Sequence, residues 1–324
     1  RMDVPLPRTP VVSQQHALPF FEALEKRVGS DPRLPKWSGE LYLEYHRGTY
    51  TAMARNKRSN RKIELKLRDV ELWCSRAARE AGMAYPAEEL HDIWQDVLTL
   101  QFHDILPGSS IQKVYEDSKE MYERMFAQLD QLERQALEAL SRNTAGEVLA
   151  YNSLSHERAD VIWFDAPEGT TALRDAAGNR YPVQFVEGRA CAFVRGLKPM
   201  TETPFWFTGA PVDEAGMNAD EQGFDTPYFT GKFDAAMRIV SLVDKRAGRE
   251  VVRAGEALNR IVCYENKPHN YDAWDVNIYY TRRHWEVDEV KSVQVISRGP
   301  VMTVLRVKYA YMSSTIEQDI ILYQ

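Results

Sequence analysis

A histidine and an aspartate stand side by side, His103 and Asp104, within segment 101–110, which reads QFHDILPGSS. A neutral imidazole can bind zinc, and a neighbouring carboxylate can accept hydrogen bonds from a sugar hydroxyl or orient the ring. A Pro-Gly pair follows at 107–108, so both side chains can point out of a helix end toward another domain. The alternative is local, with His103 donating to a carbonyl at the helix end and Asp104 capping the next turn.

Two other segments combine polar and aromatic side chains. Arg47 precedes a long helical pattern; its guanidinium could reach a sugar or, as we favour, pair with a carboxylate at a domain junction. Tyr271, Asp272, Trp274 and Asp275 offer ring faces and acceptors suited to sugars, but such residues also fill sandwich cores and cap turns. The remaining histidines show no metal-ligand spacing; they are His16, His46, His91, His156, His269 and His284.

The elements that must position these residues begin with a helical region over 51–143. Apolar residues three or four apart predict a first long helix that ends near Gly82; they are Ile63, Leu67, Val70, Cys74, Ala77 and Ala81. A later stripe of the same kind predicts another helix; it contains Ile111, Val114, Ser118, Met121, Met125, Leu129, Leu132 and Ala136.

Between these two helices the sequence predicts a third, with His103 and Asp104 at its very end. It is expected to start at Pro86 and to stop by Leu106, because Pro107 disfavours a helical conformation in the residue before it. The last of the three helices is expected to open at Ser109, where Ser-x-x-Gln has the form of a capping box. Three amphipathic helices with short connections predict an antiparallel three-helix bundle.

After Gly146 the pattern changes to short strands. Val301, Thr303, Leu305, Val307 and Tyr309 alternate with Met302, Val304, Arg306 and Lys308, which is the two-residue period of a strand with one face better buried. Turn signals without intervening helices favour an antiparallel β-sandwich. The predicted fold class is therefore α+β and multidomain, a three-helix bundle followed by a β-sandwich-like domain. The expected domains are 1–36, the end of an N-terminal α/β domain; 37–145, helical; and 146–324, a β domain truncated at its C-terminus.

Composition excludes several classes of function. The 41 Lys and Arg residues against 47 Asp and Glu residues give a net charge of -6, which offers no broad positive field for nucleic acid or anionic lipid. The three distant cysteines argue against a disulfide framework and favour buried free thiols. The chain lacks an initial Met and stops within an alternating apolar pattern, so we expect a longer parent protein.

Three segments in this order resemble signatures of the family 38 glycoside hydrolases, which are zinc-dependent α-mannosidases. They are 37–51, WSGELYLEYHRGTYT; 101–109, QFHDILPGS; and 271–275, YDAWD. The resemblance runs from about Leu18 to the end of the chain. Some relatives have His-His-Asp where this chain has Phe102-His103-Asp104, a form more like the bacterial and cytosolic branch, which implies a cytoplasmic location.

The resemblance implies a retaining α-mannosidase with an N-terminal barrel-like catalytic domain, a three-helix middle domain and a long C-terminal β region. His103 matches the zinc ligand of the helical domain, and Asp104 matches a residue that contacts the sugar. Retention requires two carboxyl groups about 5 to 5.5 Å apart, one of them the nucleophile. The family takes both from the N-terminal domain, so no catalytic residue is assigned in this chain.

The expected partner is a mannose-containing oligosaccharide or glycoside, with neither nucleic acid nor membrane, and homo-oligomer formation is left open. Because zinc takes about four ligands, we expect this chain alone to bind it weakly or not at all and to be inactive. Two alternatives remain: a non-catalytic carbohydrate-binding or assembly module, and a family 38 activity on a different glycoside.

Overall fold

The structure is a computed structural model that describes residues 14–39, 46–210, 212 and 217–323. The chain divides into two compact units at residues 44 and 45. The first unit contains one described helix, α1 (Ala17–Val28), and none of its side chains is buried. Residues 1–13, part of the expected N-terminal remnant, lie outside the described residues.

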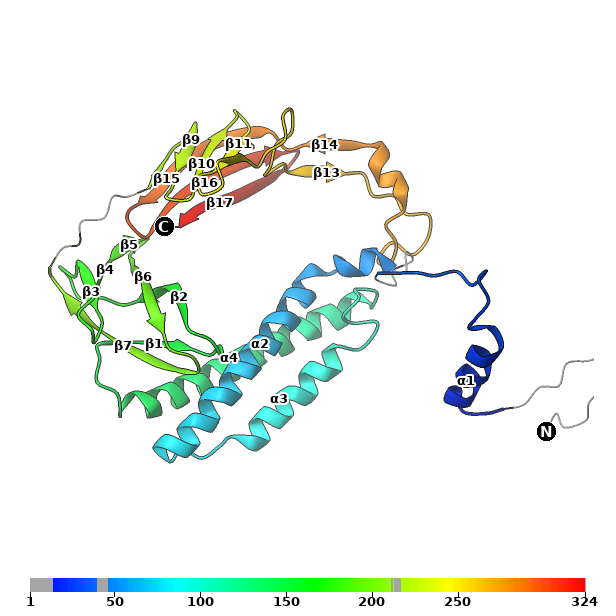
Figure 1. The fold of residues 1–324 in the computed structure, drawn as a ribbon, viewed down its shortest axis with the longest axis horizontal. Helices are drawn as coiled ribbons and strands as arrows, with labels where there is room; N and C mark the ends of the chain where they lie inside the picture. The colour runs from blue at the N-terminus through cyan, green and yellow to red at the C-terminus, as the bar shows by residue number, and fades with distance from the viewer. Residues whose placement is uncertain (1–13, 40–45, 211, 213–216, 324) are drawn as a thin grey trace, which may run out of the picture. The chain divides into compact units, whose positions relative to one another are not determined.

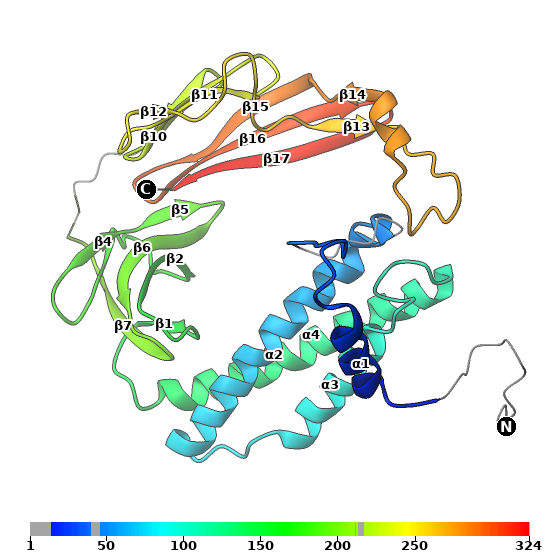
Figure 2. The ribbon, with the colours of Figure 1, turned by 45° about the vertical axis from the view of Figure 1, so that its right-hand side comes forward.

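Three long helices open the second unit and share one hydrophobic core. They are α2 (Ala54–Ala81), α3 (Ala87–Leu100) and α4 (Gln112–Ser141), preceded by the short 3₁₀ helix η2 (Gly48–Tyr50). Figure 1 and Figure 2 show α2 and α4 side by side along their length. The predicted stripe from Ile63 to Ala77 is fully buried, and α2 ends at Gly82 in the left-handed conformation, which glycine adopts readily.

Two predicted helix boundaries are wrong. The second helix ends at Leu100, so His103 and Asp104 lie in a turn beyond it rather than at the helix end. The third begins at Gln112 with Ile111 as its N-cap, and no capping box forms. The physical reason is the same for both errors: the polar groups between Leu100 and Gln112 bond to side chains of neighbouring helices and to one another instead of extending a helix.

The first group of strands forms two small antiparallel sheets, ordered β1-β7-β3-β4 and β2-β6-β5. Apolar side chains from both sheets meet in one core, which includes Phe164, Leu173 and Phe205. The strands are β1 (Val148–Asn152), β2 (Arg158–Phe164), β3 (Ala172–Arg174), β4 (Arg180–Pro182), β5 (Gln184–Val186), β6 (Arg189–Leu197) and β7 (Thr201–Thr208).

The second group forms sheets ordered β12-β11-β10-β9-β8, β15-β16-β17 and β13-β14, and the first two share a core that includes Leu305 and Val307. All registered pairs are antiparallel, so the α+β class and the antiparallel pairing expected from the sequence are confirmed. The elements are β8 (Asn218–Ala219), β9 (Gly223–Asp225), β10 (Phe229–Phe233), β11 (Ile239–Asp244), β12 (Arg249–Glu250), β13 (Val262–Tyr264), η3 (Ile278–Arg282), β14 (His284–Glu286), β15 (Glu289–Arg298), β16 (Met302–Tyr311) and β17 (Ser314–Tyr323).

All three cysteines are free thiols, as expected, and Cys74 and Cys191 are buried. Burial raises the pKa of both to about 11, so neither thiol is readily deprotonated at neutral pH. Among the helices that the structure describes, none is both long and apolar enough to cross a membrane.

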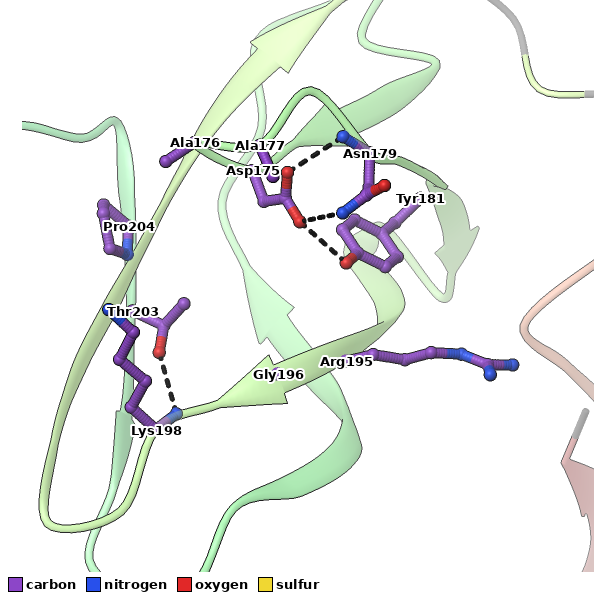
Figure 3. A pocket seen from close by; sticks show the side chains of 10 residues that line it. All are labelled: Asp175, Ala176, Ala177, Asn179, Tyr181, Arg195, Gly196, Lys198, Thr203 and Pro204. Atoms are coloured by element: carbon purple, nitrogen blue, oxygen red, sulfur yellow. Dashed lines mark hydrogen bonds between the residues drawn. The ribbon is translucent and has the colours of Figure 1, made fainter.

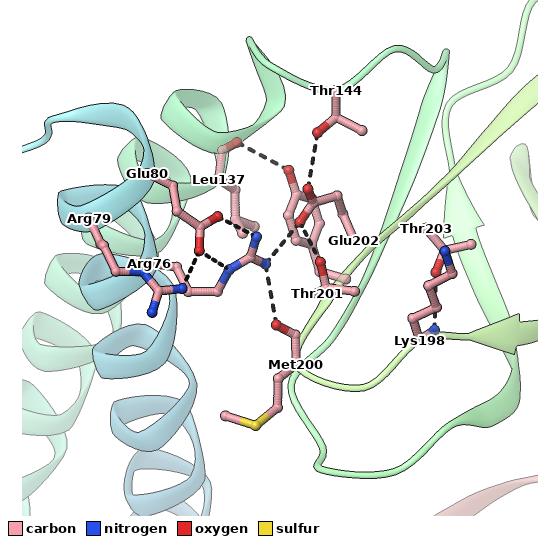
Figure 4. Close-up of polar contacts among 11 residues, drawn as sticks. Arg76, Arg79, Glu80, Leu137, Thr144, Lys198, Met200, Thr201, Glu202 and Thr203 are labelled. Carbon is pink, nitrogen blue, oxygen red and sulfur yellow. Dashed lines mark hydrogen bonds and ion pairs between the residues drawn. The ribbon is translucent and has the colours of Figure 1, made fainter.

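An arginine-centred cluster joins α2 to β7 (Figure 4). Arg76 donates to both carboxylate oxygens of Glu80 and pairs with Glu202 at 2.9 Å, while Thr144 donates to the other oxygen of Glu202. The side chains of Arg76 and Glu202 are each only 14% exposed. Because each charge is paired and hydrogen-bonded, we expect this cluster to fix the helical core against the first β sheets.

The cluster predicts a pH dependence of stability. Hydrogen bonds from Arg76 and Arg79 lower the pKa of Glu80 to about 2. Burial alone would raise the pKa of Glu202, but hydrogen bonds from Arg76 and Thr144 lower it below its ordinary value. Both carboxylates bind protons less readily in the folded state. They therefore stabilise it fully above the ordinary glutamate pKa of about 4.3 and lose this contribution as the pH falls toward 2.

We expect Arg76→Gln to lower the free energy of unfolding at pH 7 by about 2 kcal/mol, because two partly buried carboxylates lose their partner. The variant should also lose less stability than the wild type between pH 5 and pH 3. Urea denaturation at each pH measures both effects. Arg124→Gln is the matched control, since Arg124 pairs with Asp96 at the surface and should contribute about 0–1 kcal/mol. Parallel acid slopes for wild type and Arg76→Gln would contradict the assignment.

Candidate functional site

The turn that carries His103 and Asp104 is anchored by side chains of α2 and α4. Lys57 of α2 donates to the carbonyls of Leu106, at 2.7 Å, and Pro107, and Tyr115 of α4 donates to the carbonyl of Asp104. Burial lowers the pKa of Lys57. These bonds replace the amide donors that a continuing helix would supply, so they hold an irregular segment in one conformation.

Gly108 allows the turn to close. Its φ of +98° lies in the region that favours glycine, and a Cβ there would lie 2.8 Å from Cβ of Ala52. A side chain at this position would therefore strain the backbone and push the turn away from the start of α2.

His103 points into solvent rather than into the helical core. Its side chain is 76% exposed, its ring lies against Phe102, and Nε2 is 3.4 Å from Oδ2 of Asp104. Asp104 is 45% exposed, and its Oδ1 accepts a hydrogen bond from Ser109 at 3.3 Å. The local alternative is partly right for Asp104, which bonds within its own turn. The imidazole of His103 is mostly exposed, and its contacts in this turn are with the ring of Phe102 and the carboxylate of Asp104.

The segments 46–51 and 271–275 pack directly on each other. Gly48 N donates to Trp274 O at 2.6 Å, and the ring of His46 lies 4.8 Å from that of Trp274. A Cβ on Gly48 would lie 2.8 Å from the carbonyl carbon of Trp274, so only glycine allows this approach. The segment between β13 and β14 therefore lies beside the start of the helical region, as Figure 1 and Figure 2 both show.

The turn and the 271–275 segment face one depression of about 500 Å³ in the surface. Its lining comes from the turn and the start of α4 and from the 271–275 segment; it comprises Asp104, Ser109, Ser110, Ile111, Val114, Tyr271 and Trp274. This volume is within the range of about 300–1,000 Å³ typical of small-molecule sites. The contact of these distant segments was not foreseen from the sequence, nor was the place of His46 against Trp274. The sequence linked the two segments only because both resemble signatures of one family.

The other residues singled out in the sequence have different surroundings. Arg47 is half-buried as the N-cap of η2, and its role at a junction remains a prediction. Asp272 is exposed; Asp275 is buried, and its Oδ1 has no hydrogen-bond partner within the described ranges. His269 and His284 are exposed. Residues 40–45 of the first signature lie outside the described residues.

A second cavity, of about 680 Å³, lies on the first β sheets (Figure 3). Its carboxylate is already saturated: Asp175 accepts hydrogen bonds from the backbone and side chain of Asn179 and from Tyr181. Lys198 binds Thr203 only through its backbone N–H. Although this cavity is larger, no histidine lies among its described lining residues or pairs with Asp175, whereas Asp104 in the depression lies beside His103, so the depression is the better candidate site.

Two family models match the chain on either side of that depression. The alpha mannosidase middle domain matches residues 44–140, and the glycosyl hydrolases family 38 C-terminal domain matches residues 225–324. The chain belongs to glycoside hydrolase family 38. The first family 38 match contains His103 and Asp104, and the second contains Tyr271 and Trp274.

Named relatives agree with this family 38 membership. The chain is 33% identical to human Alpha-mannosidase 2C1 over 278 residues, covering 85% of this chain and 25% of that protein. It is 25% identical to Alpha-mannosidase of Saccharomyces cerevisiae over 279 residues, covering 85% of this chain and 23% of the relative. The chain thus spans about a quarter of the length of these curated relatives.

Solved structures support the family 38 fold. The crystal structure of an alpha-mannosidase from Enterococcus faecalis V583 aligns with a TM-score of 0.64 at 14% identity, covering 90% of this chain and 39% of that one. A second Enterococcus faecalis structure, of a protein in glycosyl hydrolase family 38, aligns with a TM-score of 0.62 at 14% identity, covering 89% of this chain and 39% of the other.

The described residues do not complete a zinc site. Zinc is bound by about four ligands, usually imidazole, thiolate or carboxylate. Among residues 14–39, 46–210, 212 and 217–323, no three His, Cys, Asp or Glu side chains group so as to hold a metal ion. His103 with Asp104 supplies two donors at most, which is too few for a zinc site by themselves.

We therefore expect this chain alone to bind zinc with an affinity weaker than micromolar, because two donors leave the ion largely hydrated. Isothermal calorimetry with zinc at pH 7 measures this directly. A one-to-one site of submicromolar affinity would show that the chain holds a complete set of ligands and would contradict the expectation.

Proposed function

We propose that this chain is part of a retaining α-mannosidase in which His103 is a zinc ligand and Asp104 contacts the sugar. The observation that carries the proposal is the exposed imidazole of His103, held beside Asp104 on an anchored turn at the edge of a depression. Family 38 membership and relatives named alpha-mannosidase support the choice of reaction and of a mannose-containing glycoside as substrate.

In this proposal the chain's own residues bind and orient the sugar. The carboxylate of Asp104 accepts hydrogen bonds from sugar hydroxyls, and the anchored turn keeps it in place before substrate arrives. Zinc, when bound, polarises those hydroxyls and helps to hold a distorted ring. The nucleophile and the acid/base are two carboxyl groups outside this chain, in the N-terminal catalytic domain that the family resemblance implies.

The same proposal divides the chain into residues 1–36, the end of that catalytic domain; 37–145, a three-helix middle domain; and 146–324, a β-sandwich-like region. The shared core of α2, α3 and α4 supports the second assignment, and the two cores between paired sheets support the third. The proposal also includes a cytoplasmic location, because the Phe102-His103-Asp104 segment resembles that of the bacterial and cytosolic branch of the family.

The test is proton NMR of an aryl α-mannoside incubated with the full-length enzyme that contains this chain. We expect hydrolysis with α-mannose as the first product, since retention passes through two inversions at the anomeric carbon. If β-mannose forms first, the two-carboxylate retaining mechanism is wrong. If mannosides bind but no hydrolysis occurs, the protein is a carbohydrate-binding module rather than an enzyme.

A further inference from the structure

The depression at Asp104 has two chemically different walls. The turn contributes polar groups: the carboxylate of Asp104 accepts a hydrogen bond from the hydroxyl of Ser109, and its backbone carbonyl accepts one from Ser110. Ile111 and Val114 complete the lining on the α4 side. The 271–275 segment contributes the rings of Tyr271 and Trp274. Sugar rings have hydroxyl groups on their edges and C–H groups on their faces, so a site with acceptors on one side and aromatic faces on the other suits a pyranose.

Tyr271 is held in a conformation that its own side chain disfavours. Its φ is +54°, in the left-handed region, yet 76% of the residue is exposed to solvent. Its carbonyl accepts hydrogen bonds from the N–H groups of Trp274 and Asp275, each at 2.8 Å, which fixes the strained turn. Glycine or asparagine would adopt this conformation at lower cost, and strain of this kind gathers at ligand-binding positions.

Trp274 is fixed from behind. Its carbonyl accepts the hydrogen bond from Gly48, and its ring packs against His46, so neither its backbone nor its ring is free to turn away. An aromatic face that is already ordered loses little conformational entropy when a ligand packs on it. The ring face of Trp274 is therefore arranged before binding, as is the carboxylate of Asp104 on its anchored turn.

We infer that Tyr271 and Trp274 bind a second pyranose ring of the substrate, next to the ring that Asp104 contacts. The inference rests on the proposed function for the identity of the first ring. It assigns to the β region a part in choosing oligosaccharides over single mannosides. Tyr271, the more exposed of the two, is the residue whose loss affects binding with least damage to the fold.

The test compares two substrates of the full-length enzyme, α-linked mannobiose and α-mannosyl fluoride, whose leaving group is a single atom. Tyr271→Ala should raise KM for mannobiose about tenfold, the loss expected for one aromatic contact, and change kcat/KM for the fluoride by less than about twofold. Tyr271→Phe should restore the wild-type KM, because the ring face rather than the hydroxyl makes the contact.

Tyr279→Ala is the matched control, because Tyr279 is an exposed tyrosine in η3, between the same two strands, β13 and β14. It should change the kinetic constants for neither substrate. An equal effect of Tyr271→Ala on both substrates, or no effect on mannobiose, overturns the inference. Calorimetry with mannobiose distinguishes failure of the proposed function from failure of the inference. If the wild type hydrolyses neither substrate but binds mannobiose through Tyr271, the proposed function fails and the inference stands. If Tyr271→Ala binds mannobiose as tightly as the wild type, the inference fails.

Discussion

Replacing His103 with alanine in the full-length enzyme should remove bound zinc and lower kcat/KM for an aryl α-mannoside at least about a thousandfold, or about 4 kcal/mol of transition-state stabilisation. The reason is geometric: the imidazole is 76% exposed and faces no group of the helical core, so its loss removes a ligand without leaving a cavity. Metal content by mass spectrometry and steady-state kinetics measure the two effects.

His91→Ala is the control for this change. His91 is an exposed histidine of α3 that contacts Gln95, and its removal should leave zinc and activity unchanged. The thermal midpoint of zinc-free protein should be the same for wild type, His91→Ala and His103→Ala, because exposed substitutions change stability by no more than about 0.5 kcal/mol. A His103→Ala enzyme that keeps both zinc and activity would contradict the assignment of the metal ligand.

The largest effect on stability is expected at Gln184, a buried side chain that joins the two groups of strands. It lies on β5 and is 7% exposed. Its Oε1 accepts hydrogen bonds from the N–H groups of Val301 and Met302, each at 3.0 Å, and its Nε2 donates to Met302 O at 2.8 Å and Ser297 at 2.7 Å. The side-chain amide of Gln184 thus pairs with a strand backbone as another strand would. It does so within the apolar contact between the two groups of strands.

Gln184→Ala should lower the free energy of unfolding by about 3–4 kcal/mol, because two buried N–H groups and one carbonyl lose their partner. Urea denaturation of this chain, followed by tryptophan fluorescence, measures the change. Gln294→Ala on β15 is the matched control, since that glutamine is exposed, and should stay within about 0.5 kcal/mol of the wild type. A loss below about 1 kcal/mol at Gln184 would mean that water replaces these bonds.

The sequence predicted the long elements well because their positions follow from periodicity alone. The stripe from Ile63 to Ala77 is buried as its spacing indicates, and Gly82 ends α2 in the conformation that favours glycine. Strand β16 buries Thr303, Leu305, Val307 and Tyr309 as its alternation indicates, but its first half also buries Met302 and Val304 of the opposite face. These are local patterns, and packing reinforces them rather than competing with them.

The segment between α3 and α4 was predicted poorly because distant side chains determine it. Ser109 was expected to cap a helix, but its hydroxyl donates to Asp104 instead, and Lys57 binds the carbonyls that follow Ile105. No spacing within 101–112 reveals those partners. For the same reason, the contact of Gly48 with Trp274 needs tertiary structure, and the resemblance placed both in signatures without indicating that they touch.

The central claim is that His103 holds zinc at the edge of the depression. Diffraction from crystals of the full-length enzyme, recorded at the zinc absorption edge, tests it most directly. We predict an anomalous peak about 2.0–2.1 Å from a ring nitrogen of His103, the usual zinc–imidazole distance. A zinc peak bound entirely by other residues, with the His103 ring left in solvent, would contradict the account.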